Sequence, residues 1–503
     1  MRGGNFLSGD FGSVIGPVAP EIILCVLGLL LLVAGMFLPA HRKATIIFWT
    51  CLVGLGTALC SCVMVLAAIA LSPEPLQMPN WLGATLRVDE FALVLKILIN
   101  LATILTILIS PEYIQHRLTA GRSEYFPLVV FAALGMTLLV SATDLITIYV
   151  AMELTSLVSY VLVGYMKRDP KSTEAGMKYF LVGAASSAIM LYGMSLTYGM
   201  TGATDLASIR RAIAELGSPE PMVLVGLILM VAGFGFKLAA APFHMWAPEA
   251  YEGGPTPIVA LISVGPKMAG IAVLLHVLEI GFPEIRDHWS ALIAAIAAIS
   301  MVLGNLTAIP QKNIKRMLAY SSIGQIGYIL IGVASLPQSM NDWRTSGIIV
   351  YLLVYAFMNI GAFAVVTAVS NAGLSDDIED YRGLAQSSPL LAVALLVFLA
   401  SLAGLPPTAG LWGKALIFGA AIYSGFTWLA VVGVACSVVS VFYYFNVVRV
   451  MFFLKATTPH TFRNTHLLTA GIIIAITGTL FIGVYPEPFI AMARVGQDIV
   501  AAR

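Results

Sequence analysis

The sequence predicts an all-α polytopic membrane protein with about 14 transmembrane helices, and composition is the first observation behind this prediction. Of 503 residues, 59% are hydrophobic and 11% are charged, whereas about 25% of the residues in soluble domains are charged. The apolar residues also gather in runs of roughly 20 residues, the length that crosses a bilayer. Short connections with turn residues, such as Arg168-Asp169-Pro170, separate these runs. No soluble domain, nucleotide-binding loop or metal cluster is predicted.

The predicted spans cover almost the whole chain. Their approximate bounds are 18–39, 45–71, 90–110, 124–140, 144–166, 174–200, 222–246, 257–279, 290–308, 314–335, 345–370, 389–424, 427–452 and 467–490. The fourth is short, and only Ser141, Ala142 and Thr143 separate it from the fifth. We predict no cleavable signal peptide, because no small-residue cleavage site follows the first run.

The inner spans are predicted to form two inverted five-helix repeats. Helices 4-8 and helices 9-13 make two blocks of five, and an odd number of spans inverts the second block relative to the first. The chain then divides into N-terminal helices 1-3 (residues 1-123), a first repeat (124-279), a second repeat (290-452) and a C-terminal helix 14 (453-503). The fourth helix of each block is its irregular member.

Prolines interrupt these two irregular members, helices 7 and 12, which are therefore predicted to be discontinuous. The breaks fall at Pro242 in helix 7 and at Pro406 and Pro407 in helix 12. A proline inside a helix removes a backbone hydrogen bond, and the freed carbonyls need water or polar partners at membrane depth. Lys237 precedes its break whereas Lys414 follows its own. The two lysines are therefore not equivalent by simple alignment of the repeats.

Four charged residues lie deep in the predicted spans: Glu153, Lys237, Lys267 and Lys414. Each charge at the centre of a bilayer costs roughly 2.5–3.5 kcal/mol on insertion scales. Because helices can pack without charges, we expect these residues to form a buried path for a proton or another cation. The alternative at each position is a structural charge. Glu153 could serve only to neutralise a lysine, and the helix of Lys414 could tilt it toward the membrane surface.

Other polar residues are given more ordinary positions. His244 lies near a break, where it either joins the path or caps freed carbonyls. Lys96 is expected to extend toward the membrane surface or to pair with Asp89, and we assign it no role. His276 and Glu279 are expected to be anchors at the membrane interface.

The chemistry that the deep charges permit is proton transfer. Burial favours the neutral form of a lysine and a nearby carboxylate favours its charged form, so a lysine whose carboxylate partner approaches and withdraws can bind and release a proton. No cofactor and no metal are predicted in this chain, which has no haem ligands, cysteine cluster, flavin or nicotinamide fingerprint. Its five cysteines lie in apolar runs and are expected to be small buried residues.

The basic residues predict an orientation in the membrane. Fifteen lysines and arginines fall in loops that follow odd-numbered helices, and five fall in loops that follow even-numbered helices. Loops rich in these residues face the cytoplasm. With 14 helices, both termini are then predicted on the periplasmic side. The net charge of +1 gives no indication of a nucleic-acid partner.

Four stretches resemble one protein family. They are GFGFKLAAAPFHMWAPEAYEGGPTPIVALISVGPK from Gly233 to Lys267, MELTSLVSYVLVGY around Glu153, NIKRMLAYSSIGQIGY from Asn313 to Tyr328, and SLAGLPPTAGLWGK ending at Lys414. Together they resemble subunit N of the bacterial NADH–quinone oxidoreductase, respiratory complex I. The mitochondrial ND-two and chloroplast NdhB proteins belong to the same antiporter-like group. The resemblance extends over roughly residues 85–450.

The resemblance implies a function and a set of functional residues. The family's proposed proton-translocation residues match Glu153, Lys237, Lys267 and Lys414, and its proposed bridging histidine matches His244. It implies a non-redox subunit of a translocase, with NADH, FMN, iron–sulfur clusters and quinone on other subunits. The expected partners are antiporter-like subunit M, small subunits K and J, and membrane lipid, in the bacterial inner (cytoplasmic) membrane. Subunit M usually has glutamate at the position of Lys414, and subunit L continues into a long lateral helix.

Two alternatives remain at this point. A multisubunit Mrp-type cation/proton antiporter shares these motifs, and a purely structural membrane subunit would move nothing. Neither the electron donor and quinone type of a parent enzyme nor the choice between proton and sodium follows from the sequence.

Overall fold

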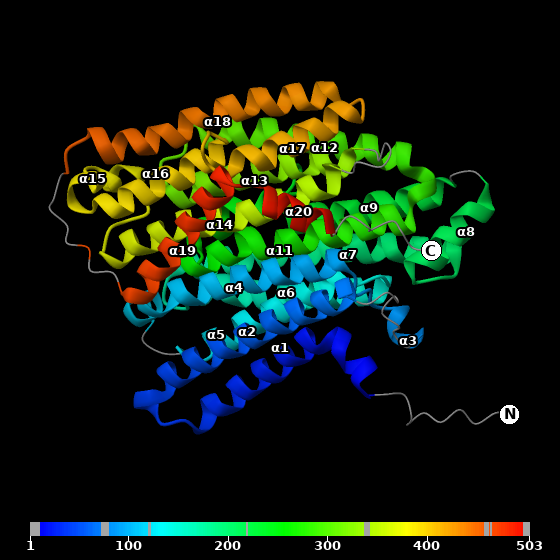
Figure 1. Cartoon of the computed structure of the whole chain (residues 1–503), viewed down its shortest axis with the longest axis horizontal. Helices are drawn as coiled ribbons and strands as arrows, with labels where there is room; N and C mark the ends of the chain where they lie inside the picture. Colours follow the sequence, from blue (N-terminus) through cyan, green and yellow to red (C-terminus); the bar gives the residue numbers. More distant parts are fainter. Residues whose placement is uncertain are drawn as a thin grey trace.

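The computed structural model describes residues 11–71, 80–118, 122–217, 220–335, 343–456, 462 and 465–495, and every regular element in these ranges is a helix (Figure 1). The elements of the N-terminal region and the first repeat are α1 (Phe11–Phe37), α2 (Ala40–Leu71), α3 (Asn80–Gly83), α4 (Glu90–Arg117), α5 (Tyr125–Ser141), α6 (Leu145–Val163), α7 (Pro170–Thr201), α8 (Leu206–Leu216), α9 (Pro221–Leu238), α10 (Trp246–Gly253), α11 (Thr256–His276) and η1 (Val277–Gly281).

The second repeat and the C-terminal region are also built of helices. Their elements are η2 (Pro283–Ile285), α12 (Arg286–Ala308), α13 (Ile314–Ala334), α14 (Trp343–Asn371), η3 (Ile378–Tyr381), α15 (Leu384–Ser387), α16 (Pro389–Ala403), α17 (Gly410–Tyr423), α18 (Thr427–Phe453), α19 (His466–Val484) and α20 (Glu487–Val495).

The helices confirm the predicted class of about 14 membrane spans. Among the described residues, 12 helices are long and apolar enough to cross a membrane. The shorter α5 supplies the fourth predicted span, and α16 with α17 supplies the broken twelfth. Asp144 separates the closely spaced fourth and fifth spans, because its carboxylate caps α6 by accepting from the backbone N–H of Ile146 at 2.9 Å.

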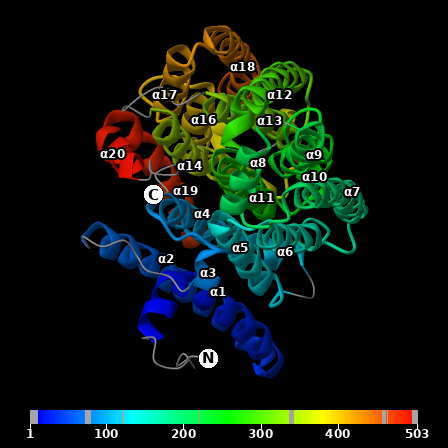
Figure 2. The ribbon, with the colours of Figure 1, turned by 90° about the vertical axis from the view of Figure 1, so that its right-hand side faces the viewer.

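The centre of the bundle is formed by α11, α13 and α14, with the other helices around them (Figure 2). All residues of α11 are buried. Peripheral helices such as α1, α2, α7 and α18 expose large apolar side chains, among them Phe37, Tyr192 and Phe442. Outward apolar residues with a buried polar interior are the arrangement expected of a protein whose solvent is lipid.

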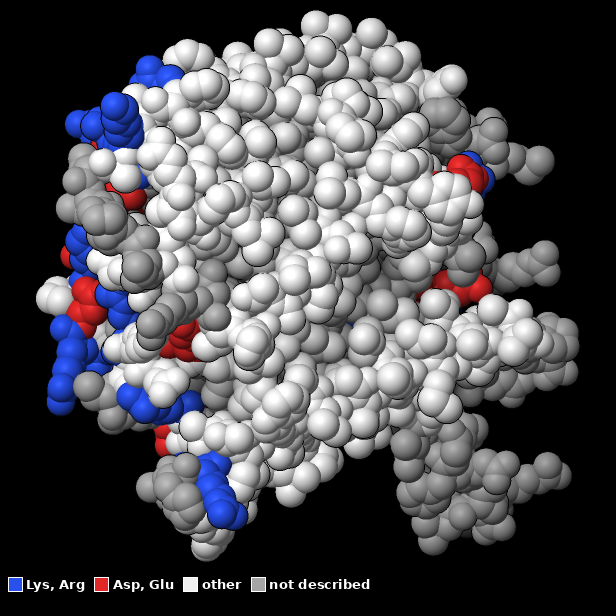
Figure 3. Space-filling model, turned by 60° about the vertical axis from the view of Figure 1, so that its left-hand side comes forward, with Lys and Arg blue, Asp and Glu red and all other residues white. Residues whose placement is uncertain are grey.

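Charged residues gather at the two ends of the bundle. In Figure 3 lysine and arginine side chains concentrate at one end, and the long middle surface is almost free of charge. In Figure 1 this is the end at which α15 lies, and we call it the α15 end; the opposite end, where α8 lies, is the α8 end.

The two repeats have the same backbone pattern and opposite directions. Asp144, before α6, forms an isolated antiparallel bridge with Asp205, before α8. Asn313, before α13, forms the corresponding bridge with Asp377, before η3. The first bridge precedes α8 and the second is followed by α15, which lie at opposite ends of the bundle (Figure 1). The prediction of inverted repeats is confirmed.

The breaks in helices 7 and 12 are built alike. Ala239 caps α9 with a φ of 56°, and Gly404 caps α16 with a φ of 88°, so both helices end in the left-handed region. The next backbone N–H in each case turns back to the helix, from Ala240 to Gly235 O at 2.8 Å and from Leu405 to Ala400 O at 3.0 Å. Each break also contains a cis X–Pro peptide. Both predicted discontinuities are confirmed.

Two other predictions lie outside what the structure tests. The division of the chain into 1-123, 124-279, 290-452 and 453-503 remains a prediction. The position of both termini on the periplasmic side also remains a prediction, because the chain ends, with Arg2 and Arg503, lie outside the described residues.

Candidate functional site

The first part of the site is a polar cluster shared by α6, α7 and α9. Lys237, in the last turn of α9, is 1% exposed, and its ammonium donates to Ser156 Oγ on α6 at 2.9 Å. Glu153 lies one turn before Ser156 on α6 and accepts a hydrogen bond from Ser187 on α7. The carboxylate that could act on Lys237 and the hydroxyl that holds it therefore lie on neighbouring turns of one helix.

No ion pair within 4.0 Å joins Glu153 and Lys237 among the described contacts, and the Ser156 hydroxyl that accepts from Lys237 donates to Met152 O at 2.8 Å. Glu153 is only half-buried, on a helix whose neighbouring residues Ile146, Val150 and Leu157 are exposed. Glu153 thus lies on the helix that holds Lys237, and a direct approach of the two residues stays a prediction.

The second part of the site surrounds Lys267 at the junction of the two repeats. Lys267 on α11 is 0% exposed, and its ammonium donates to both the hydroxyl and the carbonyl of Ser322 on α13, the latter at 3.3 Å. The Ser322 hydroxyl lies 2.6 Å from the Tyr355 hydroxyl on α14 and 3.3 Å from the Tyr251 hydroxyl on α10. No carboxylate contacts Lys267 within the described part of the chain.

Lys237 and Lys267 occupy neighbouring helices close to the same level. A Cβ atom added at Gly270, one turn beyond Lys267 on α11, would lie 2.9 Å from Leu238 Cδ2 and 3.7 Å from Lys237 Cγ. The absence of a side chain at Gly270 thus lets the end of α9, with Leu238 and Lys237, pack closely against α11. Among the described residues no hydrogen bond links the two ammonium groups directly.

The third part of the site is Lys414 in the second break. Lys414 on α17 is 4% exposed. Its ammonium donates to Leu402 O at 3.0 Å and Ala403 O at 2.9 Å, at the end of α16, and to Ser437 Oγ on α18 at 2.8 Å. It also lies 4.7 Å from the centre of the Tyr328 ring. Cations are stabilised at the C-terminus of a helix, so the break itself holds this lysine.

Uncharged side chains connect the surroundings of Lys267 and Lys414. Gln325, one turn beyond Ser322 on α13, donates to Leu402 O at 2.9 Å and accepts from the Tyr351 hydroxyl. Tyr351 lies one turn before Tyr355 on α14. Gln325 and Lys414 thus share the acceptor Leu402 O, and Gln325 and Tyr351 each lie one helical turn from a group at the Lys267 site, Ser322 and Tyr355.

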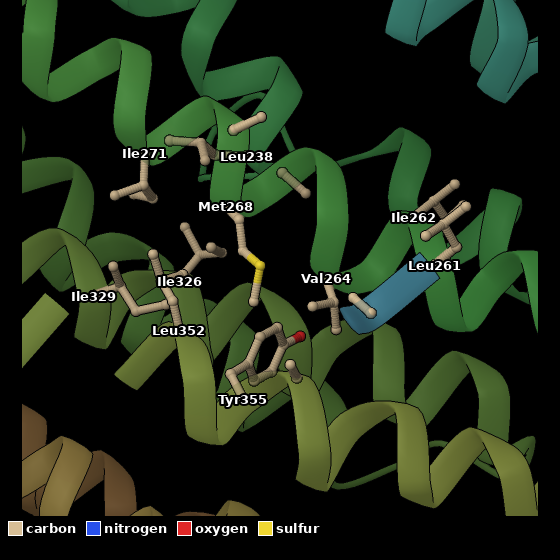
Figure 4. Packing of buried hydrophobic residues seen from close by; sticks show 14 of the residues in the cluster. Leu238, Leu261, Ile262, Val264, Met268, Ile271, Ile326, Ile329, Leu352 and Tyr355 are labelled. Carbon is tan, nitrogen blue, oxygen red and sulfur yellow. The ribbon is translucent and has the colours of Figure 1, made fainter. Parts of the chain in front are cut away.

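Apolar side chains enclose this polar line. Figure 4 shows Met268, Ile326 and Leu352 packed between α11, α13 and α14, with Tyr355 reaching from α14 toward Val264. Such packing excludes bulk water and strengthens each polar contact that it surrounds. Proton transfer along the line is then limited to its hydroxyl, amide and ammonium groups and to water held between them.

His244 is the predicted site residue that the structure does not join to the others. It lies in the turn between α9 and α10 and is half-buried. Its Nδ1 atom is buried and has no hydrogen-bond partner among the described groups. No described contact of Lys237 or Lys267 involves it.

Three expectations about other polar residues are wrong. Lys96 does not extend to the surface or pair with Asp89: it is 0% exposed and pairs with Glu21 on α1 at 2.7 Å. His276 is fully buried rather than an interface anchor. Glu279 is also buried, because it pairs with Arg286 and, at 2.7 Å, with Arg344. Sequence depth alone gave no signal for these partners: Glu21 and Arg344 lie on helices far along the chain, and Arg286 begins the next helix after Glu279.

The structure also gives the positions of potential metal ligands. The described residues contain no group of three or more histidine, cysteine, aspartate or glutamate side chains that could hold a metal ion. The five cysteines are free thiols, and Cys60 is exposed on the apolar face of α2, contrary to the expectation that all five are buried.

Comparisons with known proteins agree with this architecture. Residues 142–440 match the family described as "NADH:quinone oxidoreductase/Mrp antiporter, TM". The chain is 42% identical to NADH-quinone oxidoreductase subunit N of Trichlorobacter lovleyi, over 96% of this chain and 97% of the relative. It is 43% identical to the subunit N of Rhodospirillum rubrum, over 89% of each chain.

Solved structures give the same result. A chain of respiratory complex I from Thermus thermophilus with bound aureothin superimposes with a TM-score of 0.76 at 33% identity, covering 94% of this chain and 98% of that one. A chain of the Mrp complex from Dietzia has a TM-score of 0.82 at 20% identity, covering 96% and 98%, and shows the fold alone. With inverted repeats, two broken helices and near-full-length relatives, the chain belongs to the NADH–quinone oxidoreductase subunit N family.

Proposed function

We propose that this protein is a proton-translocating, antiporter-like subunit in the membrane arm of a respiratory NADH–quinone oxidoreductase. Protons move through Glu153, Lys237, Lys267 and Lys414, with His244 beside the first break, and electron transfer in other subunits drives the movement. The observation that carries the proposal is the line of buried lysines, each held by hydroxyl or carbonyl groups, that runs from α6 through the central helices to α18.

The contacts of each lysine support a role in proton exchange. Ser156 and Ser322 each offer a hydroxyl, a group that can accept a proton from one side and donate another to the opposite side. Lys267 has no carboxylate within the described contacts, so nothing fixes its ammonium permanently in the charged form. Glu153 lies one turn from Ser156 on α6, and a change in the charge of that carboxylate would alter the balance between the two states of Lys237.

The test is Lys237→Met in the complete complex. We expect assembly and quinone reduction to persist, with loss of proton translocation per electron pair. The matched control is Lys178→Met, which removes an exposed lysine that pairs with Glu174 at 2.7 Å on the surface, and which should translocate normally. Normal translocation in Lys237→Met would contradict the proposal and support a purely structural subunit.

The partners and the orientation belong to the same proposal. The expected neighbours are antiporter-like subunit M and small subunits K and J, in the bacterial inner membrane. The concentration of basic side chains at the α15 end (Figure 3) supports a cytoplasmic position for that end. Both termini are then periplasmic, and a reporter fused after Arg503 should be active only if it functions outside the cytoplasm.

The second candidate function is a subunit of a multisubunit Mrp-type cation/proton antiporter. The fold shared with the Dietzia Mrp chain favours it, but relatives above 40% identity are named as subunit N. Purification separates the two candidates. A respiratory subunit should copurify with flavin and iron–sulfur proteins, whereas an antiporter subunit should copurify with small membrane proteins alone.

A further inference from the structure

A buried ion pair lies in the N-terminal helices, away from the lysine line. Lys96 on α4 and Glu21 on α1 approach to 2.7 Å, with side-chain exposures of 0% and 7%. Asn100, one turn further along α4, donates to Lys96 O at 2.9 Å and lies 4.0 Å from Cys62 Sγ on α2. Lys267, by contrast, is surrounded by α10, α13 and α14.

The pair leaves much of its hydrogen-bonding capacity unused. Both carboxylate oxygens of Glu21, the Lys96 ammonium nitrogen and Asn100 Oδ1 are buried without an aligned hydrogen bond to any described group. Four such atoms in one place are exceptional, because buried polar groups almost always have a partner. By comparison, Glu112 is a buried carboxylate on α4 whose hydrogen-bonding capacity is used: the N–H and the hydroxyl of Thr465 both donate to it at 3.1 Å. Ordered water is the group that satisfies such a site.

The pair lies near the beginning of α4, which is at the α8 end of the bundle. Lys96 lies six residues into α4, which is about 9 Å along the helix axis. Before α4 begins, Arg87 and Asp89 form an ion pair that is partly exposed, at 22% and 21%. On α1, Pro20 cannot donate to Gly16 O. A Cβ atom at Gly16 would have no described neighbour within 4 Å, so there is open space on that side of α1.

We propose that Glu21, Lys96 and Asn100 hold water and form a second protonation site, which exchanges protons with solvent at the α8 end. In the exchange, water takes a proton from the Lys96 ammonium and gives one to the Glu21 carboxylate, so that –NH₃⁺ and –COO⁻ become –NH₂ and –COOH while the water keeps its number of protons. Because this water exchanges with solvent, the proton that reaches Glu21 can be one from solvent. The reverse transfer restores the ion pair. The pair has no net charge in either state, which lets it persist in an apolar bundle without a counterion. The site does not depend on proton movement along the lysine line.

Hydration is tested with two native cysteines on one face of α2. Cys62 lies beside Asn100, whereas Cys51 is three turns away, and both are 0% exposed. In the complex, with Cys25, Cys60 and Cys436 replaced by alanine, exchange of S–H for S–D in D₂O is followed by infrared spectroscopy. We expect Cys62 to exchange at least tenfold faster than Cys51. Equal, slow exchange at both positions would overturn the proposal.

The double variant Glu21→Leu/Lys96→Met shows whether the pair is what holds the water. Replacement of a buried ion pair by apolar residues of similar volume is often tolerated. We expect Cys62 exchange to slow to the Cys51 rate in this variant. Unchanged rapid exchange would show that water reaches α2 by another route and would count against the site. If the variant does not assemble, the comparison of Cys62 with Cys51 in the chain with the native pair still decides on hydration.

Protonation is tested by infrared difference spectra of the complex between H₂O and D₂O, because the two states of the pair bind the same number of protons and a change of pH does not convert one into the other. We expect a carboxylic-acid C=O band that shifts in D₂O and disappears in Glu21→Gln. Glu112→Gln is the matched control, because Glu112 is equally buried, at the opposite end of α4, but has its own hydrogen-bond donors. The band should survive in this control. Identical spectra for Glu21→Gln and the unmodified complex would rule out a protonation site at Glu21.

Discussion

The two helix breaks have the same backbone but hold their lysines differently. When the two sequences are aligned at the cap residues Ala239 and Gly404, Lys237 corresponds to Leu402 and Lys414 corresponds to Glu249. Neither lysine therefore has a lysine at its equivalent position. Lys414 donates to the carbonyls that its own break exposes. Lys237 instead donates to Ser156 on another helix, one turn from Glu153.

The comparison shows that one backbone device can position a buried charge in two ways. In the second break the lysine closes the end of α16. In the first break an uncharged group does so, because the Trp246 indole N–H donates to Phe236 O at 2.9 Å. Lys237 is thus free of any capping role, and its environment is set by Ser156 and Glu153. The following predictions test this difference, from the largest expected effect to the smallest.

Lys267, which lies between the two breaks, should give the largest effect. We expect Lys267→Arg to lose proton translocation almost as completely as Lys267→Ala, at least tenfold, because arginine is always protonated and cannot exchange a proton with Ser322. The measurement is the number of protons translocated per electron pair in membrane vesicles. A wild-type ratio in Lys267→Arg would show that this position needs only a fixed positive charge.

Lys414→Met should destabilise the protein more than Lys237→Met does. Lys414 makes three hydrogen bonds and Lys237 makes one, and hydrogen bonds to a charged group are worth about 1.5–3 kcal/mol. Leu402 O keeps its bond from Gln325 in the variant, so we expect a net loss of about 2 kcal/mol. Unfolding in mixed detergent–SDS titrations measures this quantity. Equal losses in the two variants would remove the distinction between the breaks.

Glu153 and Lys237 should behave as a coupled pair, which has no counterpart in the second break. We expect Glu153→Gln to impair translocation in an assembled complex, with Glu153→Asp milder because the charge is kept. The double variant with Lys237→Met should deviate from additivity by about 0.5–3 kcal/mol in the apparent activation free energy. Ser156→Ala should weaken this coupling. Additive effects would mean that the glutamate acts independently of the lysine.

The smallest effect should come from the uncharged cap of the first break. Trp246→Phe removes the N–H that donates to Phe236 O but keeps a ring to stack on Tyr179, where the centroids are 4.1 Å apart. We expect a loss of about 1 kcal/mol, the usual value of one hydrogen bond. Trp412→Phe is the control in the second break, since Trp412 donates to Gly483 O at 2.9 Å in a partly exposed position. It should cost less than Trp246→Phe.

The sequence predicted the architecture more fully than the site. Apolar runs and prolines act locally, so spans such as α5 and the interruptions at Pro242 and Pro407 were predictable from short stretches. The depth of Lys237, Lys267 and Lys414 was predictable for the same reason. Their partners were not, because a serine on a membrane helix looks the same whether it faces lipid, its own carbonyl or a lysine.

Lys96 illustrates the limit of such reasoning. Its depth of six residues in α4 is compatible with an extended, surface-seeking side chain, and only the packing of α1 against the bundle brings Glu21 to it. The two residues are far apart in the sequence, and neither is flanked by a motif. Interhelical contacts of this kind depend on the direction that each helix face takes, which a single sequence does not record.

Two of the isolated backbone bridges, one in each repeat, restrict how the helices can move. Asp144 with Asp205, and Asn313 with Asp377, each tie two segments of one repeat together by paired backbone hydrogen bonds of 2.8–3.0 Å. Each bridge fixes two segments at one end of the bundle, so these segments cannot slide lengthwise past one another without breaking the backbone hydrogen bonds. A rearrangement that keeps both bridges is therefore expected as a rotation or bending in the middle of the membrane, at the level of the interrupted helices.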